Sequence, residues 1–173
     1  MTRLDRFVAD ARAAAAAPDP LRAATRLMAD TFADPQALAD TLPEPDDEVL
    51  LFEDATVSIW HERFAPDREL PPHDHAMPAL LGVYRGRERN RLWQVVDGVA
   101  RPGGTLLLEA GQVHVFAPHE VHSVQALDGA PSFGLHVYLG PLGRVARNLY
   151  DRETGMAQPL TEAAFTAAIR EMP

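Results

Sequence analysis

The feature that most constrains the fold is a series of short apolar segments between residues 49 and 139, separated at fairly regular intervals by turn-forming Gly, Pro and Asp. Such segments, rich in Val, Leu, Ile, Phe, Trp and Tyr, are typical of β-strands. The predicted strands are Val49–Phe52, Thr56–Phe64, Ala79–Arg85, Arg91–Val96, Thr105–Leu108, Val113–Phe116, Val121–Ala126 and Ser132–Leu139. The predicted turns are Asp97-Gly98, Pro102-Gly103-Gly104, Glu109-Ala110-Gly111 and Asp128-Gly129. This spacing predicts a mainly β fold, a sandwich or small barrel of the jelly-roll kind.

Both ends of the chain have a helical pattern instead. From Leu4 to about Ala17, and from Leu21 to about Leu42, the sequence is Ala-rich and free of Gly, and its larger apolar residues recur every three or four positions. This pattern predicts two amphipathic helices. The segment Leu160–Met172 predicts a C-terminal helix. We therefore divide the chain into an N-terminal helical extension packed on the barrel, residues 1–45, and a barrel with a C-terminal helix, residues 46–173.

The composition excludes several kinds of chemistry. All 16 basic residues are Arg and Cys is absent, which excludes a lysine Schiff base, a thiol nucleophile, a thiolate metal site and a disulfide. With 25 acidic residues the formal net charge is −9, which argues against a nucleic-acid partner. The chain lacks the long apolar run of a signal peptide or a membrane span. We expect a cytoplasmic protein with no membrane partner, and a homodimer stays open.

A pair of histidines two residues apart is the first candidate site. On an extended strand, His73 and His75 would point to the same face and could chelate one ion, while Asp74 would point the opposite way. The alternative is a pair of solvent-facing histidines on an edge strand. Among the other histidines, His61 is expected at the surface or on a pocket wall, and His114 in or beside the barrel.

A second histidine segment begins at Gly111 and ends at His122. In order and separation, the two segments resemble the two signatures of the cupin superfamily, of which the first contains H-x-H and the second ends in His. The resemblance implies a double-stranded β-helix, which is a jelly-roll barrel, and it implies that His73, His75 and His122 bind a metal ion. His119 competes as the third ligand, although it stands at the turn position where cupins place Gly.

Most cupins add a Glu ligand, but here that position falls on Ala79 or Leu80. A three-histidine cupin with an apolar residue at this point resembles the thiol dioxygenases, namely cysteine dioxygenase and bacterial 3-mercaptopropionate dioxygenase. The segments Pro72–His75 and Arg85–Asn90 look like that family's H-D-H strand and R-G-x-E-R-N turn. The resemblance covers about residues 49–155. It implies Fe(II) as the cofactor, with Zn, Ni and Mn as alternatives.

The segment Leu135-His136-Val137-Tyr138 resembles the family's outer-sphere Ser, His and Tyr triad. The resemblance makes His136 and Tyr138 catalytic residues. Gly134 stands where the triad has Ser, although Ser132 is close by. The alternative for Tyr138 is an aromatic residue of the barrel core with a satisfied hydroxyl.

The resemblance also points to a substrate class. Arg147 falls where the mercaptopropionate-type enzymes hold the substrate carboxylate, and Arg144 is a neighbouring candidate. No Arg occurs between residues 46 and 55, where cysteine dioxygenase carries its own, so cysteine is the less favoured substrate. The implied reaction oxidises a small carboxylate-bearing thiol with O2 to a sulfinate. Two alternatives stay open: a hydrolase or isomerase that uses Zn or another divalent metal, and a non-catalytic barrel that binds a small molecule.

Overall fold

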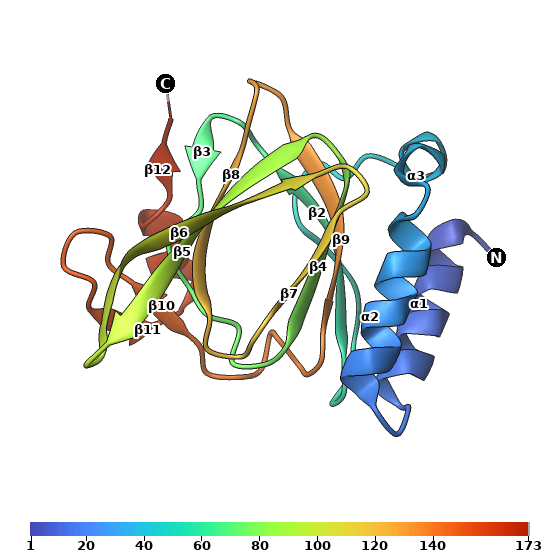
Figure 1. Ribbon diagram of the computed structural model, residues 1–173, viewed down its shortest axis with the longest axis horizontal. Helices are drawn as coiled ribbons and strands as arrows, with labels where there is room; N and C mark the ends of the chain where they lie inside the picture. Colours follow the sequence, from blue (N-terminus) through green and yellow to red (C-terminus); the bar gives the residue numbers. More distant parts are fainter. Residues whose placement is uncertain (173) are drawn as a thin grey trace.

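The computed structural model describes residues 1–172, and it begins with three helices followed by a β-rich region (Figure 1). The helices are α1 (Arg3–Ala15), α2 (Pro20–Phe32), α3 (Pro35–Thr41) and, near the C-terminus, α4 (Glu162–Ala167). The strands are β1 (Val49–Glu53), β2 (Ser58–Phe64), β3 (Arg68–Glu69), β4 (Ala79–Arg85), β5 (Arg87–Val96), β6 (Val99–Glu109), β7 (Val113–Phe116), β8 (Val121–Ala126), β9 (Ser132–Tyr138), β10 (Asn148–Tyr150), β11 (Ala157–Pro159) and β12 (Arg170–Glu171). None of the helices within residues 1–172 is long and apolar enough to cross a membrane.

The strands form two five-stranded sheets that face each other, in the orders β1-β2-β9-β4-β7 and β12-β3-β8-β5-β6. Within these sheets β5 pairs with β6, β4 with β7, β3 with β8 and β2 with β9, all antiparallel. This nested pairing is a long hairpin, with its tip at β5 and β6, rolled into a barrel. The predicted mainly β fold, a jelly-roll or double-stranded β-helix with N-terminal helices and a short C-terminal helix, is confirmed.

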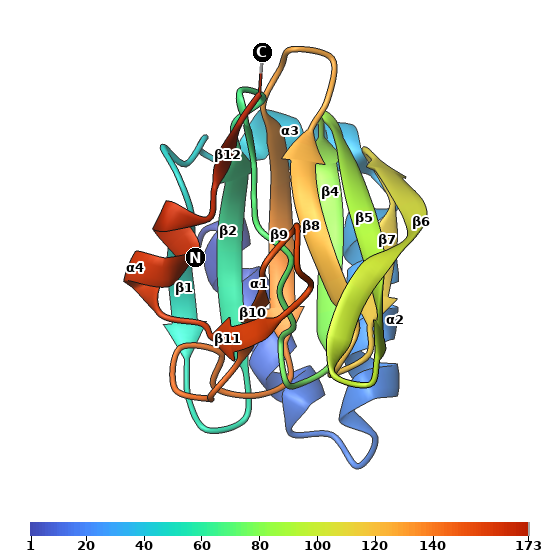
Figure 2. The same ribbon diagram turned by 90° about the vertical axis from the view of Figure 1, so that its left-hand side faces the viewer.

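The N-terminal helices and the C-terminal segment lie on opposite sides of the barrel (Figures 1 and 2). The largest apolar cluster lies between the N-terminal helices and the outer face of the sheet that contains β2, β9 and β4. In that cluster the ring of Phe32 occupies the space that a side chain at Gly82 would take, so α2 can approach β4 closely. The N-terminal helices therefore cover this sheet from the outside and do not fill the interior of the barrel.

The second predicted helix is in fact two helices. α2 ends at Phe32, and α3 begins at Pro35, where the Asp34 side chain accepts a hydrogen bond from the Ala37 amide at 3.0 Å. Proline suits the first position of a helix, and it disfavours helical geometry at the residue before it. The expectation of one helix from Leu21 to Leu42 was wrong because Asp34-Pro35 begins a new helix.

The predicted turn at Pro102-Gly103-Gly104 was also wrong, because these residues lie inside β6. The register of β5 against β6 shifts at this point, between Arg91 and Trp93, and Pro102 pairs with Trp93. A proline without an amide hydrogen is tolerated on an edge strand and at such irregularities. β6 is the edge strand of its sheet.

The C-terminal helix is shorter than the predicted range of Leu160–Met172. Thr161 caps the start of α4 through a hydrogen bond from the Ala164 amide, and the helix ends at Ala167. The chain then extends into β12, which pairs with β3. This return places Phe165 of α4 against the open side of the barrel, where it contacts His73.

Candidate metal centre

Three buried histidines meet inside the barrel. His122 lies on β8, and His73 and His75 lie on the irregular segment between β3 and β4. The backbones of His73 and His122 exchange two hydrogen bonds, of 3.0 and 3.1 Å, so a short bridge rather than a full strand holds the first histidine in place. One imidazole nitrogen from each of the three residues lies within 4.8 Å of the others. This distance allows a single ion to be bound between them.

The hydrogen bonds of two of these rings leave their inner nitrogens free. Nδ1 of His73 lies 2.9 Å from the Pro71 carbonyl oxygen, and Nδ1 of His122 lies 2.8 Å from Oδ1 of Asn90. Both oxygens accept hydrogen bonds, so both Nδ1 atoms carry the hydrogen and both Nε2 atoms present an electron pair. Such outer contacts fix the tautomer of a metal-binding histidine.

The third ring, that of His75, has no hydrogen-bond partner outside the cluster within residues 1–172. Nε2 of His122 lies 3.4 Å from Nε2 of His75, and Nδ1 of His75 is buried with no hydrogen-bond partner among residues 1–172. Burial lowers the pKa of His73 to about 4 and holds the pKa values of His75 and His122 well below their usual range. All three rings are therefore neutral at pH 7, the form in which imidazole binds metals. The donor set fits a divalent transition metal or zinc.

The residues around the cluster supply no carboxylate to it. Within residues 1–172, no Asp or Glu joins the three histidines in a metal-binding group, and Ala79 and Leu80, the two candidates for the predicted Glu position, are both fully buried. Asp74 points away and accepts hydrogen bonds from the backbone and side-chain nitrogens of Asn148, at 3.0 and 2.8 Å. His119, the competing third ligand, is exposed and lies outside the cluster.

The predicted pair of His136 and Tyr138 lies beside the cluster. Both residues are on β9, and Nδ1 of His136 lies 3.2 Å from the Tyr138 hydroxyl. The Tyr138 ring centroid lies 5.3 Å from that of His75. Burial raises the pKa of Tyr138 well above its usual value, so the hydroxyl keeps its hydrogen at neutral pH. Ser132 does not replace the missing triad serine, because its hydroxyl donates to Glu88 at 2.9 Å.

Arg147 reaches the same cavity from the segment after β9. The cavity has a volume of about 750 Å³ and is lined by the three clustered histidines, His136, Tyr138 and Arg147, together with apolar side chains such as Trp60 and Phe165. Within residues 1–172, no carboxylate lies within 4.0 Å of the Arg147 guanidinium. An unpaired guanidinium in a partly apolar cavity is suited to bind an anionic group.

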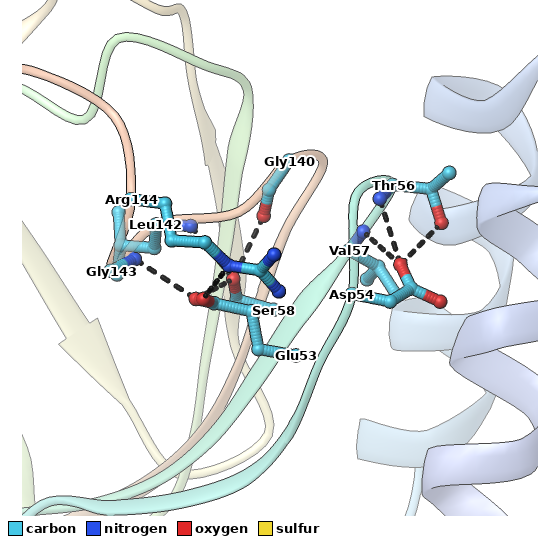
Figure 3. Close-up of polar contacts among 9 residues, drawn as sticks. All are labelled: Glu53, Asp54, Thr56, Val57, Ser58, Gly140, Leu142, Gly143 and Arg144. Carbon is cyan, nitrogen blue, oxygen red and sulfur yellow. Dashed lines mark hydrogen bonds and ion pairs between the residues drawn. The ribbon is translucent and has the colours of Figure 1, made fainter.

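The segment that carries Arg147 is held by Glu53 and Ser58 at the end of the barrel (Figure 3). The Ser58 hydroxyl lies 2.7 Å from Glu53 and 2.8 Å from the Gly140 carbonyl oxygen, and it accepts from the Leu142 amide at 2.8 Å. Glu53 also accepts from the Gly143 amide and from Arg144. Burial alone would raise the pKa of Glu53, but these hydrogen bonds lower it. Arg144, the predicted alternative to Arg147, thus anchors the segment through Glu53 and is not among the residues that line the cavity.

Sequence reasoning missed two polar residues of the site, Glu62 and Asn90. Glu62 lines the cavity, and its Oε1 lies 3.7 Å from Nδ1 of His136. The alternation of side chains on β2 was a usable signal, since it places Trp60 and Glu62 on one face. It also places His61 on the other face, where it contacts the Tyr84 hydroxyl at 2.8 Å beneath the N-terminal helices. The expectation that His61 lies at the surface or on a pocket wall was therefore wrong.

No protein-family model matches the chain. Similar solved structures include an uncharacterised protein with a double-stranded β-helix domain from Klebsiella pneumoniae, with 17% identity, a TM-score of 0.48, and coverage of 70% of this chain and 87% of that one. A cupin 2 conserved barrel domain protein from Leptotrichia buccalis has 18% identity, a TM-score of 0.47, and coverage of 59% and 46%.

The DMSP lyase DddQ from Ruegeria pomeroyi has 14% identity, a TM-score of 0.47, and coverage of 58% of this chain and 49% of that one. This chain therefore spans about half the length of the second and third of these structures. With all three TM-scores below 0.5, none of these likenesses bears on what the chain does.

Proposed function

We propose that the protein is a non-haem Fe(II)-dependent dioxygenase for a small carboxylate-bearing thiol of the 3-mercaptopropionate type. The overall reaction adds both atoms of O2 to the thiol and yields the sulfinic acid. The observation that carries the proposal is the buried set of three neutral histidines without a carboxylate, beside a Tyr hydroxyl and an unpaired Arg in one cavity. His73, His75 and His122 would hold the metal. Bound iron(II) would supply positions for the thiolate and for O2, and the redox chemistry between them.

The other residues bind and orient the substrate. Arg147 offers a planar fork of N–H donors that matches a carboxylate, so it would fix the end of the substrate that lies away from the metal. The Tyr138 hydroxyl, which burial keeps protonated, would donate a hydrogen bond to the reacting end. Trp60, Leu81 and Phe165 line the same cavity and would exclude water from it.

The direct test measures oxygen consumption and product together. Protein loaded anaerobically with Fe(II) is mixed with 3-mercaptopropionate and a panel of other thiols, and the sulfinate is identified by mass spectrometry. We expect oxygen uptake and sulfinate formation that depend on Fe(II) and are lost in His122→Ala. Absence of uptake with every thiol would reject the proposal.

The role of Arg147 has its own test in the same assay. Arg147→Leu should raise KM for the carboxylate-bearing thiol at least about 30-fold, which corresponds to about 2 kcal/mol for a lost charge-assisted pair. A thiol without a carboxylate should be oxidised equally by both proteins. Arg63→Leu, which removes another guanidinium lining the cavity, serves as the control and should leave KM within about twofold.

A second candidate function keeps the site and changes the metal. Three neutral imidazoles with a free position also suit zinc and an activated water, as in a hydrolase or isomerase. Metal analysis of protein purified without added metal separates the two candidates, because stoichiometric zinc with no Fe(II)-supported oxygen uptake would favour the second.

A further inference from the structure

Two buried polar atoms lie unpartnered near the Tyr138 hydroxyl. Glu62 on β2 and His136 on β9 belong to paired strands, with Glu62 opposite Gly134 and Trp60 opposite His136. Their side chains are only 5% and 1% exposed. Oε2 of Glu62 and Nε2 of His136 have no hydrogen-bond partner within residues 1–172. Since buried polar groups in folded proteins are nearly always paired, this arrangement requires a physical explanation.

The surroundings of His136 differ sharply at its two ring nitrogens. Nδ1 lies 3.2 Å from the Tyr138 hydroxyl oxygen and 3.7 Å from Oε1 of Glu62, the latter a close polar contact rather than a hydrogen bond. Nε2 faces Gly134, where a Cβ atom would lie 3.1 Å from it and where no acceptor is present among the described residues. A hydrogen on Nδ1 would thus meet two oxygens, and a hydrogen on Nε2 would meet none.

The imidazole is neutral, so it carries one hydrogen and must choose between these nitrogens. Burial lowers the pKa of His136 to about 3, which excludes the doubly protonated ring near neutral pH. A buried N–H without an acceptor costs about 1–3 kcal/mol. This cost disfavours the Nε2–H tautomer, and the Glu62 oxygen favours a hydrogen on Nδ1.

We propose that Glu62 is a positioning residue that holds His136 in its Nδ1–H tautomer and thereby frees the hydroxyl hydrogen of Tyr138 to point into the cavity. In this tautomer the His136 N–H donates to the Tyr138 oxygen, which leaves the phenol hydrogen available to a bound ligand. In the opposite tautomer Nδ1 would accept that hydrogen, and Tyr138 would have none to offer. Glu62 therefore orients His136 from a neighbouring strand, in place of the Ser that the family resemblance puts at position 134.

The protonation of Glu62 is compatible with this role. Burial, and then the nearby carboxylates Glu48 and Glu88, raise its pKa well above the usual value. A neutral carboxyl still accepts through its carbonyl oxygen, which we place at Oε1, beside His136. Its hydroxyl would then be Oε2, the atom without a protein partner.

The test uses metal-free, full-length protein, so its outcome is independent of the proposed dioxygenase activity. Two-bond ¹H–¹⁵N correlation spectra of ¹⁵N-labelled protein at pH 7 distinguish the two histidine tautomers, and the His136→Asn variant identifies the His136 signals. We expect the Nδ1–H tautomer in the wild-type protein and in Glu62→Gln, whose amide oxygen can still accept. Glu62→Leu should raise the share of the Nε2–H tautomer of His136, because only the missing acceptor at Nε2 would then disfavour it. Glu48→Gln, which changes another carboxylate lining the cavity, should not.

An Nε2–H tautomer in the wild-type protein would overturn the proposal, and this result requires no variant to fold. A tautomer population in a folded Glu62→Leu protein equal to that of the wild type would overturn it as well, because the tautomer would then not depend on Glu62. A purely structural role of Glu62 predicts a change in stability with no change in these signals.

Discussion

Asn90 sets the direction in which His122 presents its electron pair. The amide oxygen of this fully buried residue lies 2.8 Å from Nδ1 of His122, on β5 next to β8. The contact does for His122 what the Pro71 carbonyl does for His73. The tautomers of these two rings of the candidate metal centre therefore depend on two oxygens that lie outside the histidine cluster.

Asn90→Leu should weaken metal binding without removing any ligand. With no acceptor at Nδ1, the hydrogen of His122 can move to Nε2 and compete with the metal, so we expect a loss of affinity of about 10- to 100-fold. Titration of the metal-free protein with Zn(II) against a chromophoric chelator measures it. Gln94→Leu, an exposed change on the same strand, is the control. Equal affinities in the two variants would show that Asn90 does not orient His122.

At the scale of residues, the sequence predicted the side chains that stand in recognisable motifs. It missed those whose partners are distant in the sequence and come close only in the folded chain. His73, His75 and His122 stand in two recognisable motifs, and the structure brings them together. Glu62 and Asn90 lie on strands far along the chain from their partners His136 and His122. His61 was misplaced because both faces of β2 are buried, one by the cavity and one by the helices, so alternation alone does not reveal which face is inside.

At the scale of elements, α2 and α3 both pack on β4 and connect the N-terminal extension to the barrel. Phe32, 1% exposed, lies at the C-terminal end of α2 against Gly82 of β4. Phe32→Ala should lower the free energy of unfolding by about 3–5 kcal/mol, because a large buried side chain would leave a cavity that the rigid sheet cannot fill. Urea denaturation measures this change. Leu21→Ala, on an exposed position of the same helix, should cost far less. A small loss in Phe32→Ala, or a separate unfolding step for the helices, would contradict this coupling.

The position of the segment from Gly140 to Arg147 depends on the contacts of the Ser58 hydroxyl. Ser58→Ala would remove the hydroxyl that contacts Glu53, Gly140 and Leu142 (Figure 3), and only the 3.1 Å hydrogen bond from the Leu142 amide to the Gly140 carbonyl would remain between the two backbone groups. Each hydrogen bond lost should cost about 0.5–1.5 kcal/mol. We expect faster hydrogen exchange at the Leu142 amide and a higher KM for a carboxylate-bearing substrate, because Arg147 would be less well placed. Thr56→Ala alters the neighbouring Asp54 turn and should change neither. Unchanged exchange at Leu142 in Ser58→Ala would refute the anchoring role.

The sequence predicted the elements whose structure is set by their own residues. It missed those whose structure is set by pairing with another segment of the chain. Turn residues and β-rich runs predicted the main barrel strands, but β10, β11 and β12 are two or three residues long and exist because neighbouring segments pair with them. Pro102-Gly103-Gly104 has the composition of a turn, yet its pairing with β5 keeps it extended. At Asp34-Pro35 the local signal was present in the sequence and was not used.

At the scale of the whole molecule, the burial of neutral histidines makes stability depend on pH. Burial lowers the pKa of His61 from 6.5 to about 4. Between these values the unfolded chain binds the proton and the folded chain does not, so this residue's contribution to stability is full above pH 6.5 and is lost as the pH falls toward 4. The contribution of this single residue is on the order of 2–3 kcal/mol.

His61→Phe should therefore flatten the pH dependence. Urea denaturation of metal-free wild-type and variant proteins at pH 7 and pH 4.5 gives the two differences in the free energy of unfolding. The loss on acidification should be smaller in the variant, whatever its stability at pH 7. Using the difference between proteins removes the opposite effect of Glu88, whose pKa burial raises to about 7. A pH dependence equal to that of the wild type would contradict the buried, neutral state of His61.

The proposed function requires a single metal ion held by His73, His75 and His122, and metal stoichiometry tests this requirement most directly. Metal-free protein is equilibrated anaerobically with Fe(II), freed of unbound metal and analysed for iron per chain, beside His75→Ala and the control His119→Ala, which changes an exposed histidine outside the cluster. We predict one iron per chain in the wild type and in His119→Ala, and little in His75→Ala. Equal iron contents in His75→Ala and the wild type, or a wild type that retains no Fe(II), would contradict this proposal.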